Sequence, residues 1–193
     1  NRLGIYTNQT FGFNNRSEFK FTVNYFPEHW DDRNSRGNGL YKLASRLFGQ
    51  IAYGSDTAKP FSWSGAITAE QEELGGWTYT SDLGFTYTPS SRFSLDLDLR
   101  YKKREGWLVY RGGRNFSTYS ADDLKPTMSA DFFFSARHQL RMTLQWAGIK
   151  ARDDDYLMVP LSEGALIQRT TPPSDGTEDF TISRLTAQIR YRW

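Results

Sequence analysis

The chain has 193 residues and a formal net charge of +2, from 24 basic and 22 acidic side chains. This balance argues against nucleic acid as a partner, and the absence of cysteine excludes disulfides, thiolate metal sites and cysteine nucleophiles. No run approaches the ~18 consecutive apolar residues of a membrane-spanning helix. The mean hydropathy of -0.66 still allows a transmembrane β-barrel, because only every second residue of its strands meets lipid.

Apolar and polar residues alternate with period two in about nine segments, which predicts β-strands. In the first third of the chain the clearest case is Phe19, Phe21, Val23 and Tyr25, which alternate with polar residues. The pattern is weaker at residues 3–13, 43–53 and 61–70, where Gly and Ser interrupt the apolar side. Residues 40–49 are the best candidate for a helix, but Ser45 and Gly49 weaken it.

The middle of the chain carries the strongest alternation. Between residues 77 and 87 the apolar side holds Trp77, Tyr79, Leu83, Phe85 and Tyr87. Between residues 92 and 102 one side holds Phe93, Leu95, Leu97, Leu99 and Tyr101, and the other holds Arg92, Ser94, Asp96, Asp98, Arg100 and Lys102. A helix at ~100° per residue would scatter these apolar residues around its axis, so the pattern favours strands.

Three further segments follow the same pattern toward the C-terminus. Their apolar sides are, in chain order, Met128, Ala130, Phe132 and Phe134; then Leu140, Met142, Leu144 and Trp146; then Leu185, Ala187, Ile189, Tyr191 and Trp193. The opposite side of the last segment is strongly cationic, with Arg184, Arg190 and Arg192.

Short and long connections alternate along the chain. The short ones are residues 14–17, 55–60, 89–91 and 136–139; the long ones are residues 27–39, 104–123 and 153–178, with a shorter one at 72–76. This is typical of an up-and-down antiparallel sheet with tight turns at one rim and extended loops at the other. We therefore predict an all-β chain: an antiparallel up-and-down meander of about 8–10 strands, forming one domain over residues 1–193. The meander would be a transmembrane outer-membrane β-barrel or a segment of a larger one.

In this interpretation lipid covers the apolar side, because no segment is predicted to form an amphipathic helix that would cover it in water. A two-layer sandwich is the alternative packing, although its strands are usually shorter and more evenly spaced. The predicted lipid-facing residues are Phe93, Leu95, Leu97, Leu99, Leu140, Met142, Leu144, Leu185 and Ile189. The predicted aromatic girdle at the membrane boundary is Trp77, Tyr87, Tyr101, Trp146, Tyr191 and Trp193. The predicted lumen-facing residues are Asp96, Asp98, Arg100, Arg141, Arg184 and Arg190. Their opposite charges would pair laterally and stiffen the wall, or bias passing solutes by charge.

Residues that could carry chemistry are few. His29 is predicted in the first long loop and His138 in a tight turn, on opposite rims, which argues against a Ser-His-Asp site. The acidic clusters 31–32, 122–123 and 153–155 are predicted in the long loops, as solvated charge rather than calcium ligands. We expect no catalytic residue, no metal site and no cofactor.

Several unbroken stretches are similar to a known family: residues 40–43 (LYKL), 53–56 (YGSD), 71–77 (QEELGGW), 88–93 (TPSSRF), 106–110 (GWLVY), 131–137 (DFFFSAR), 144–149 (LQWAGI) and 179–185 (DFTISRL). They resemble the C-terminal region of Gram-negative envelope proteins in which an outer-membrane β-barrel domain of unknown function follows a module similar to the family 9 carbohydrate-binding modules.

The resemblance implies a non-enzymatic domain in the outer membrane of a Gram-negative bacterium, acting as a membrane anchor or pore. The implied partners are outer-membrane lipid and lipopolysaccharide, the barrel-assembly machinery during insertion, and oligosaccharide through a module that this sequence lacks. The family continues past residues 190–193 (RYRW) and has many strands before Asn1, so we expect the chain to be part of a larger barrel. Residues 1–6 show no signal-peptide pattern, so an exported protein would here be mature or cut from something longer.

Two other functions stay open at this point. One is a soluble antiparallel β-protein that binds an apolar ligand or partner across its aromatic side; such a protein would stay monomeric without detergent. The weaker one is an outer-membrane hydrolase, which would require His29 within hydrogen-bond reach of a serine.

Overall fold

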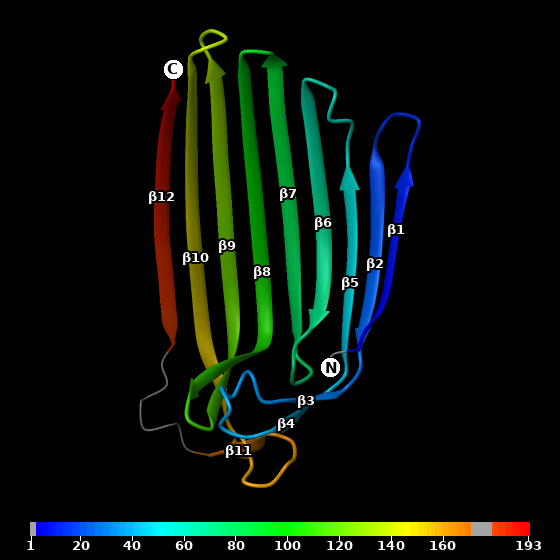
Figure 1. Ribbon diagram of the computed structural model, residues 1–193, viewed down its shortest axis with the longest axis vertical. Helices are drawn as coiled ribbons and strands as arrows, with labels where there is room; N and C mark the ends of the chain where they lie inside the picture. Colours follow the sequence, from blue (N-terminus) through cyan, green and yellow to red (C-terminus); the bar gives the residue numbers. More distant parts are fainter. Residues whose placement is uncertain (1–2, 171–178) are drawn as a thin grey trace.

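The computed structural model describes residues 3–170 and 179–193, and these contain strands and no helix. The prediction of an all-β antiparallel meander is confirmed (Figure 1). The strands are β1 (Ile5–Gly12), β2 (Glu18–Phe26), β3 (His29–Asp31), β4 (Tyr41–Leu43), β5 (Arg46–Gly54), β6 (Phe61–Gln71), β7 (Trp77–Ser90), β8 (Phe93–Gly112), β9 (Asn115–Phe133), β10 (Gln139–Met158), β11 (Ile167–Arg169) and β12 (Phe180–Arg192). The segment expected to be the best helix candidate forms β4 and part of β5. Within the described ranges, no helix is long and apolar enough to cross a membrane.

Ten of the strands form one sheet in the order β1-β2-β5-β6-β7-β8-β9-β10, with β11 and β12 both paired to β10. Every long strand pairs antiparallel with the next long strand in the chain. Strands β3 and β4 form a separate two-stranded sheet. In the described part of the chain β1 pairs only with β2 and β12 only with β10, so these two strands are the edges of an open sheet.

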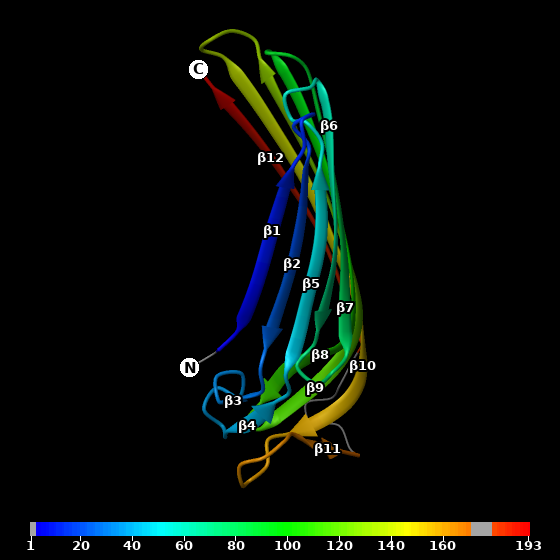
Figure 2. The same ribbon diagram turned by 90° about the vertical axis from the view of Figure 1, so that its right-hand side faces the viewer.

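The sheet is strongly curved. Seen from the side, its two edges lie toward one side and its central strands bow toward the other, so the sheet has a concave and a convex side (Figure 2). The tight turns predicted at residues 14–17, 55–60 and 136–139 lie together at one rim, the upper rim in Figure 1, with the β7–β8 turn at residues 91–92. The other rim carries β3, β4 and β11.

Two predicted long loops are wrong in part. Residues 104–123 form the end of β8 and the start of β9, joined by a tight turn at Gly113 and Arg114. Gly112, the last residue of β8, and Gly113 both have positive φ. Residues 153–158 continue β10 and residues 167–169 form β11, while residues 171–178 lie outside the described ranges. Register shifts between Arg104 and Trp107 and between Asp153 and Tyr156 bend these extensions and interrupt the alternation of apolar residues.

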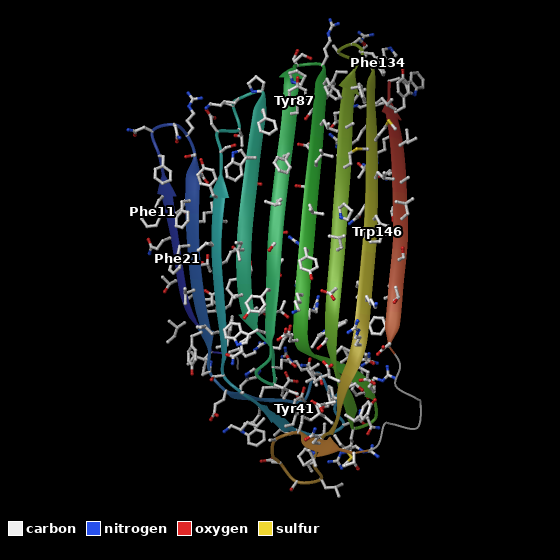
Figure 3. All side chains as sticks on the ribbon, turned by 180° about the vertical axis from the view of Figure 1, so that it is seen from behind. Phe11, Phe21, Tyr41, Tyr87, Phe134 and Trp146 are labelled. Atoms are coloured by element: carbon white, nitrogen blue, oxygen red, sulfur yellow. The ribbon has the colours of Figure 1, made fainter. Side chains whose placement is uncertain are left out.

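The buried core lies at the lower rim rather than along the sheet. Tyr41 and Leu43 of β4 pack with Phe116 of β9 and with Val159, and all four side chains are almost completely buried. A second cluster, Tyr119, Ala121 and Ala151, contacts Trp107 and Phe180. The extended β8–β9 hairpin, β4 and the start of the β10–β11 connection therefore form a small packed cap at this end of the sheet (Figure 3).

Candidate functional site

The convex side of the described sheet carries an apolar surface that crosses its nine long strands, which are β1, β2, β5 to β10 and β12. At its centre, Leu97 of β8 lies opposite Phe85 of β7 and Met128 of β9, and Met128 lies opposite Leu144 of β10. The same row ends at Ala187 of β12. Figure 3 shows this side, with the aromatic side chains of Phe11, Phe21, Tyr87 and Trp146 on it. Many of its large side chains are about two-fifths exposed or more, for example Leu97 at 41%, Ile51 at 46% and Leu185 at 65%, while others such as Leu95 and Trp146 are half-buried.

The predicted lipid-facing and girdle residues share this side. Leu95 lies opposite Tyr87, Leu99 opposite Leu83, Met142 opposite Ile189, and Leu140 opposite Tyr191. Tyr87 and Tyr191 lie toward the rim of tight turns, whereas Tyr101 lies further down β8. Trp146 lies opposite Leu185, and its indole N–H donates to Ser183 Oγ at 3.0 Å. Whether lipid meets these side chains stays a prediction.

A row of charges ends the apolar surface toward the lower rim. Lys103 of β8 lies opposite Asp122 of β9, which lies opposite Lys150 of β10. The hydroxyl of Tyr101 donates to the Asp122 carboxylate, and Lys103 forms an ion pair with Glu105 at 3.3 Å. Below this row the same side of β9 is covered by protein in the cap. The apolar side thus has an uncovered band, a charged boundary and a covered end.

The concave side is polar, and charged pairs cross it between neighbouring strands. Arg100 Nε donates to Asp82 at 2.6 Å between β8 and β7, and Arg141 Nε donates to Asp131 at 2.8 Å between β10 and β9. Lateral pairing of the predicted kind is therefore present for Arg100 and Arg141. Thr68, Thr78 and Thr80 are buried on this side. The predicted lumen residues Asp96, Asp98, Arg184 and Arg190 belong to the same polar set.

The segment between β2 and β5, predicted as a long loop, folds back at the lower end of the concave side (Figure 2). Ser35 is fully buried, and its Oγ lies 2.9 Å from the Asp32 carbonyl and 2.7 Å from that of Gly39. The amide of Asn34 donates to both carboxylate oxygens of Glu73, and the amide of Asn38 donates to the Tyr110 hydroxyl at 3.2 Å. These contacts attach the segment to the β6–β7 turn and to the β8–β9 hairpin.

A hollow of about 450 Å³ lies between this segment and the concave wall. It is lined by charged residues, namely Arg33, Arg36, Arg46, Arg104, Glu70, Glu72 and Glu73, with Trp107 and Tyr110 beside them. Burial raises the pKa of Glu73, while the nearby Arg46 partly opposes this effect. The sequence pattern did not indicate this hollow, because its residues come from four separate parts of the chain and none belongs to a motif.

The candidate catalytic and metal residues are not assembled into a site. The Nδ1 of His29 lies 3.4 Å from the Pro27 carbonyl, and its Nε2 is buried without a hydrogen-bond partner among residues 3–170 and 179–193. His138 Nδ1 lies 2.6 Å from the Tyr191 hydroxyl. The loop position predicted for two acidic clusters is wrong, since Asp122 and Asp123 lie in β9 and residues 153–155 lie in β10. No group of His, Asp or Glu residues that could hold a metal ion occurs in the described ranges.

Comparison with protein families, with curated proteins and with solved structures found no match for this chain. The resemblance to the envelope-protein family therefore stays a prediction, and the geometry of the chain alone bears on its function.

Proposed function

We propose that this chain is a wall segment of a transmembrane β-barrel in the outer membrane of a Gram-negative bacterium. Its convex apolar side would face hydrocarbon, its concave polar side would face water, and its role would be to anchor a protein in the membrane or to form part of a pore.

The observation that carries this proposal is the uneven covering of the apolar side. Where apolar side chains continue below the charged row, the chain buries them in its own cap, as a soluble protein would. Above that row, the same side of nine strands is left uncovered by any described residue. A continuous apolar surface of this extent is unusual for a soluble monomer, and lipid is the medium that accepts it.

The height of the uncovered band fits a membrane. From Phe93 to Tyr101 a strand advances roughly 27 Å at ~3.4 Å per residue, close to the ~25 Å apolar band of outer-membrane barrels. Tyr87 and Tyr191 lie near one boundary of the band and Tyr101 near the other, beside Asp122 and Lys103. Tyrosine rings favour such boundaries, because the ring is apolar and the hydroxyl is polar.

The directions of the edge strands support a larger barrel. Eight successive antiparallel pairings connect β1 to β12, so β1 and β12 run in the same direction (Figure 1). Closing the sheet by pairing these two strands would make the closing pair parallel, unlike the rest of the wall. An antiparallel barrel would need an odd number of further strands between the two edges.

The rim that bears the cap would be the outer one, where outer-membrane barrels have their longer connections. Its neighbours would then be the phosphate groups of lipopolysaccharide. A link to oligosaccharide through a separate module rests on the family resemblance alone.

Single-cysteine labelling tests the proposal. The chain has no native cysteine, so a thiol-reactive label attaches only to the introduced residue. Leu97→Cys and Asp98→Cys place a fluorophore on neighbouring residues of β8 that lie on opposite sides of the sheet. The protein is refolded into phospholipid vesicles, and quenching by lipids brominated along their acyl chains is measured. We expect strong quenching at Leu97 and little at Asp98.

A second pair, Leu144→Cys and Gln145→Cys on β10, repeats the comparison on another strand. Equal quenching within both pairs would contradict the proposal. So would a protein that stays monomeric in buffer without detergent, because that result would favour the soluble binding protein instead.

A further inference from the structure

The charged hollow at the lower end of the concave side contains an excess of hydrogen-bond donors. Its lining includes four guanidinium groups and three carboxylates, Glu70, Glu72 and Glu73. Two of these carboxylates already accept hydrogen bonds from the protein: Glu73 from the Asn34 amide at 3.2 and 3.3 Å, and Glu72 from the Thr78 hydroxyl. The carboxylates are therefore largely satisfied by the protein.

The four guanidinium groups are not satisfied in the same way. The guanidinium groups of Arg33, Arg36, Arg46 and Arg104 donate no hydrogen bond to, and form no ion pair with, any residue in the described part of the chain. The Nε of Arg46 is also buried without a partner in that part. A buried guanidinium donor without an acceptor is costly, so an acceptor from outside the chain would be favourable here.

Three of these groups lie over aromatic rings. The guanidinium of Arg104 lies 4.6 Å from the ring centre of Trp107, that of Arg36 lies 4.9 Å from Tyr110, and that of Arg46 lies 5.7 Å from Phe26. A guanidinium stacked on a ring keeps its N–H donors in its own plane, where they remain available to a planar acceptor such as a carboxylate or phosphate. Less side-chain entropy is then lost when such a ligand binds.

We propose that this hollow binds a small polar solute through an oxyanion, either a carboxylate or a phosphate group. Its volume of about 450 Å³ is within the range of small-molecule sites. The segment between β2 and β5 closes one side of the hollow, so Arg33 and Arg36 reach the solute from that segment while Arg46 and Arg104 reach it from the wall. In a completed barrel this site would lie inside the lumen near one mouth, a position that rests on the proposed function, whereas binding itself does not.

Isothermal titration calorimetry of the full chain in detergent micelles tests the site. Glucose 6-phosphate and citrate are the anionic probes, and glucose is the neutral match for the first. We expect both anions to bind and glucose not to bind, with affinity falling as salt is raised. Binding of glucose as tight as that of glucose 6-phosphate, or heat from neither anion, would overturn the proposal. Binding of only one anion supports the proposal and shows which group the hollow recognises, phosphate or carboxylate.

Variants locate the binding. Arg36→Gln and Arg104→Gln should each weaken glucose 6-phosphate binding about tenfold or more, the usual effect of losing a charge-assisted hydrogen bond. Arg184→Gln removes an arginine of the same concave side, from β12 and outside the hollow, and should leave the affinity unchanged. Glu70→Gln removes a negative charge from the hollow and should tighten binding severalfold, a result that loss of folding cannot imitate.

Equal affinities in the Arg36→Gln and Arg184→Gln proteins would show that the anion binds elsewhere. The outcome is independent of the membrane proposal, because the vesicle quenching experiment and the calorimetry report on different sides of the sheet.

Discussion

Phe116 and Met128 lie on the same side of β9, yet Phe116 is 1% exposed and Met128 is 41% exposed. The two residues are an even number of positions apart in one strand, so alternation alone cannot explain the difference. Phe116 is covered by Tyr41, at a ring distance of 5.5 Å, and by the other cap residues. Met128 lies beside Leu97 of β8 and Leu144 of β10, and it belongs to neither of the buried clusters found among the described residues.

Replacing Phe116 by Ala should therefore destabilise the protein by about 3–5 kcal/mol, the usual range for removing a buried aromatic side chain. Met128→Ala, at a partly exposed position, should cost much less. Denaturant unfolding of both variants in the same detergent gives the two free energies. Equal losses would mean that the cap is not the stable core of this chain.

A charge placed on the apolar band should be costly only if the band meets lipid. In vesicles, Leu144→Arg should lower the free energy of unfolding by roughly 2–4 kcal/mol, as for arginine near the middle of other barrel walls. Gln145→Arg, one residue along β10 and on the polar side, should have little effect. If the protein is soluble and both positions face water, the two substitutions should change the free energy of unfolding by nearly the same amount.

The clear strands of the wall were predictable from the sequence because only one side of each is apolar. Leu95, Leu97 and Leu99 alternate with Asp96, Asp98 and Arg100, and the structure pairs them as alternation requires. The ends of the same strands were not predictable. Around residues 107–110 of β8 the apolar residues are consecutive, because Trp107 contacts one buried cluster and Leu108 the other. A strand covered on both sides loses its alternation.

The hollow could not be predicted from the sequence either. Arg46 and Glu70 come from strands that were predicted, but Arg33 and Arg36 come from a segment predicted only as a loop. Their convergence depends on hydrogen bonds between residues far apart in the chain, such as Asn34 with Glu73. Local patterns contain no signal for such contacts.

Gly76 should not tolerate a side chain. A Cβ added there would overlap the backbone carbonyl oxygen of Glu105, where the β6–β7 turn passes close to β8. Since the obstacle is backbone, Gly76→Ala should cost about 1–3 kcal/mol by forcing the two segments apart. Gly49→Ala on β5 is the matched control, because no atom lies within 4 Å of its added Cβ. If thermal unfolding shows the Gly49→Ala protein to be less stable than the Gly76→Ala protein, this steric explanation is contradicted.

Glu73 should make stability depend on pH. Burial raises its pKa above the ordinary 4.5, so the folded state holds the proton more tightly than the unfolded state does. Its contribution is therefore most favourable below pH 4.5 and is lost as the pH rises through the raised value. Glu73→Gln removes the buried charge and keeps an acceptor for Asn34. The variant should be more stable than the parent at neutral pH, and the gain should shrink on acidification.

Denaturant midpoints of parent and variant across this pH range check the prediction. Glu163→Gln, at an exposed position, serves as the control. A stability gain for Glu73→Gln that grows as the pH falls would mean that the pKa of Glu73 is not raised on folding.

The meander order also has a consequence for how the wall is made. Because β1, β2 and then β5 to β10 each pair with their nearest long neighbour in the chain, every new strand can add to an edge that already exists. The sheet can therefore fold one hairpin at a time from either end of the chain. No strand needs a partner that is distant in the sequence, and short loops close quickly. If the wall enters a membrane as proposed, new strands would then add at the two edges. A proline in the middle of β12, which removes a backbone donor, should stop further strands from pairing at that edge and leave the earlier hairpins intact.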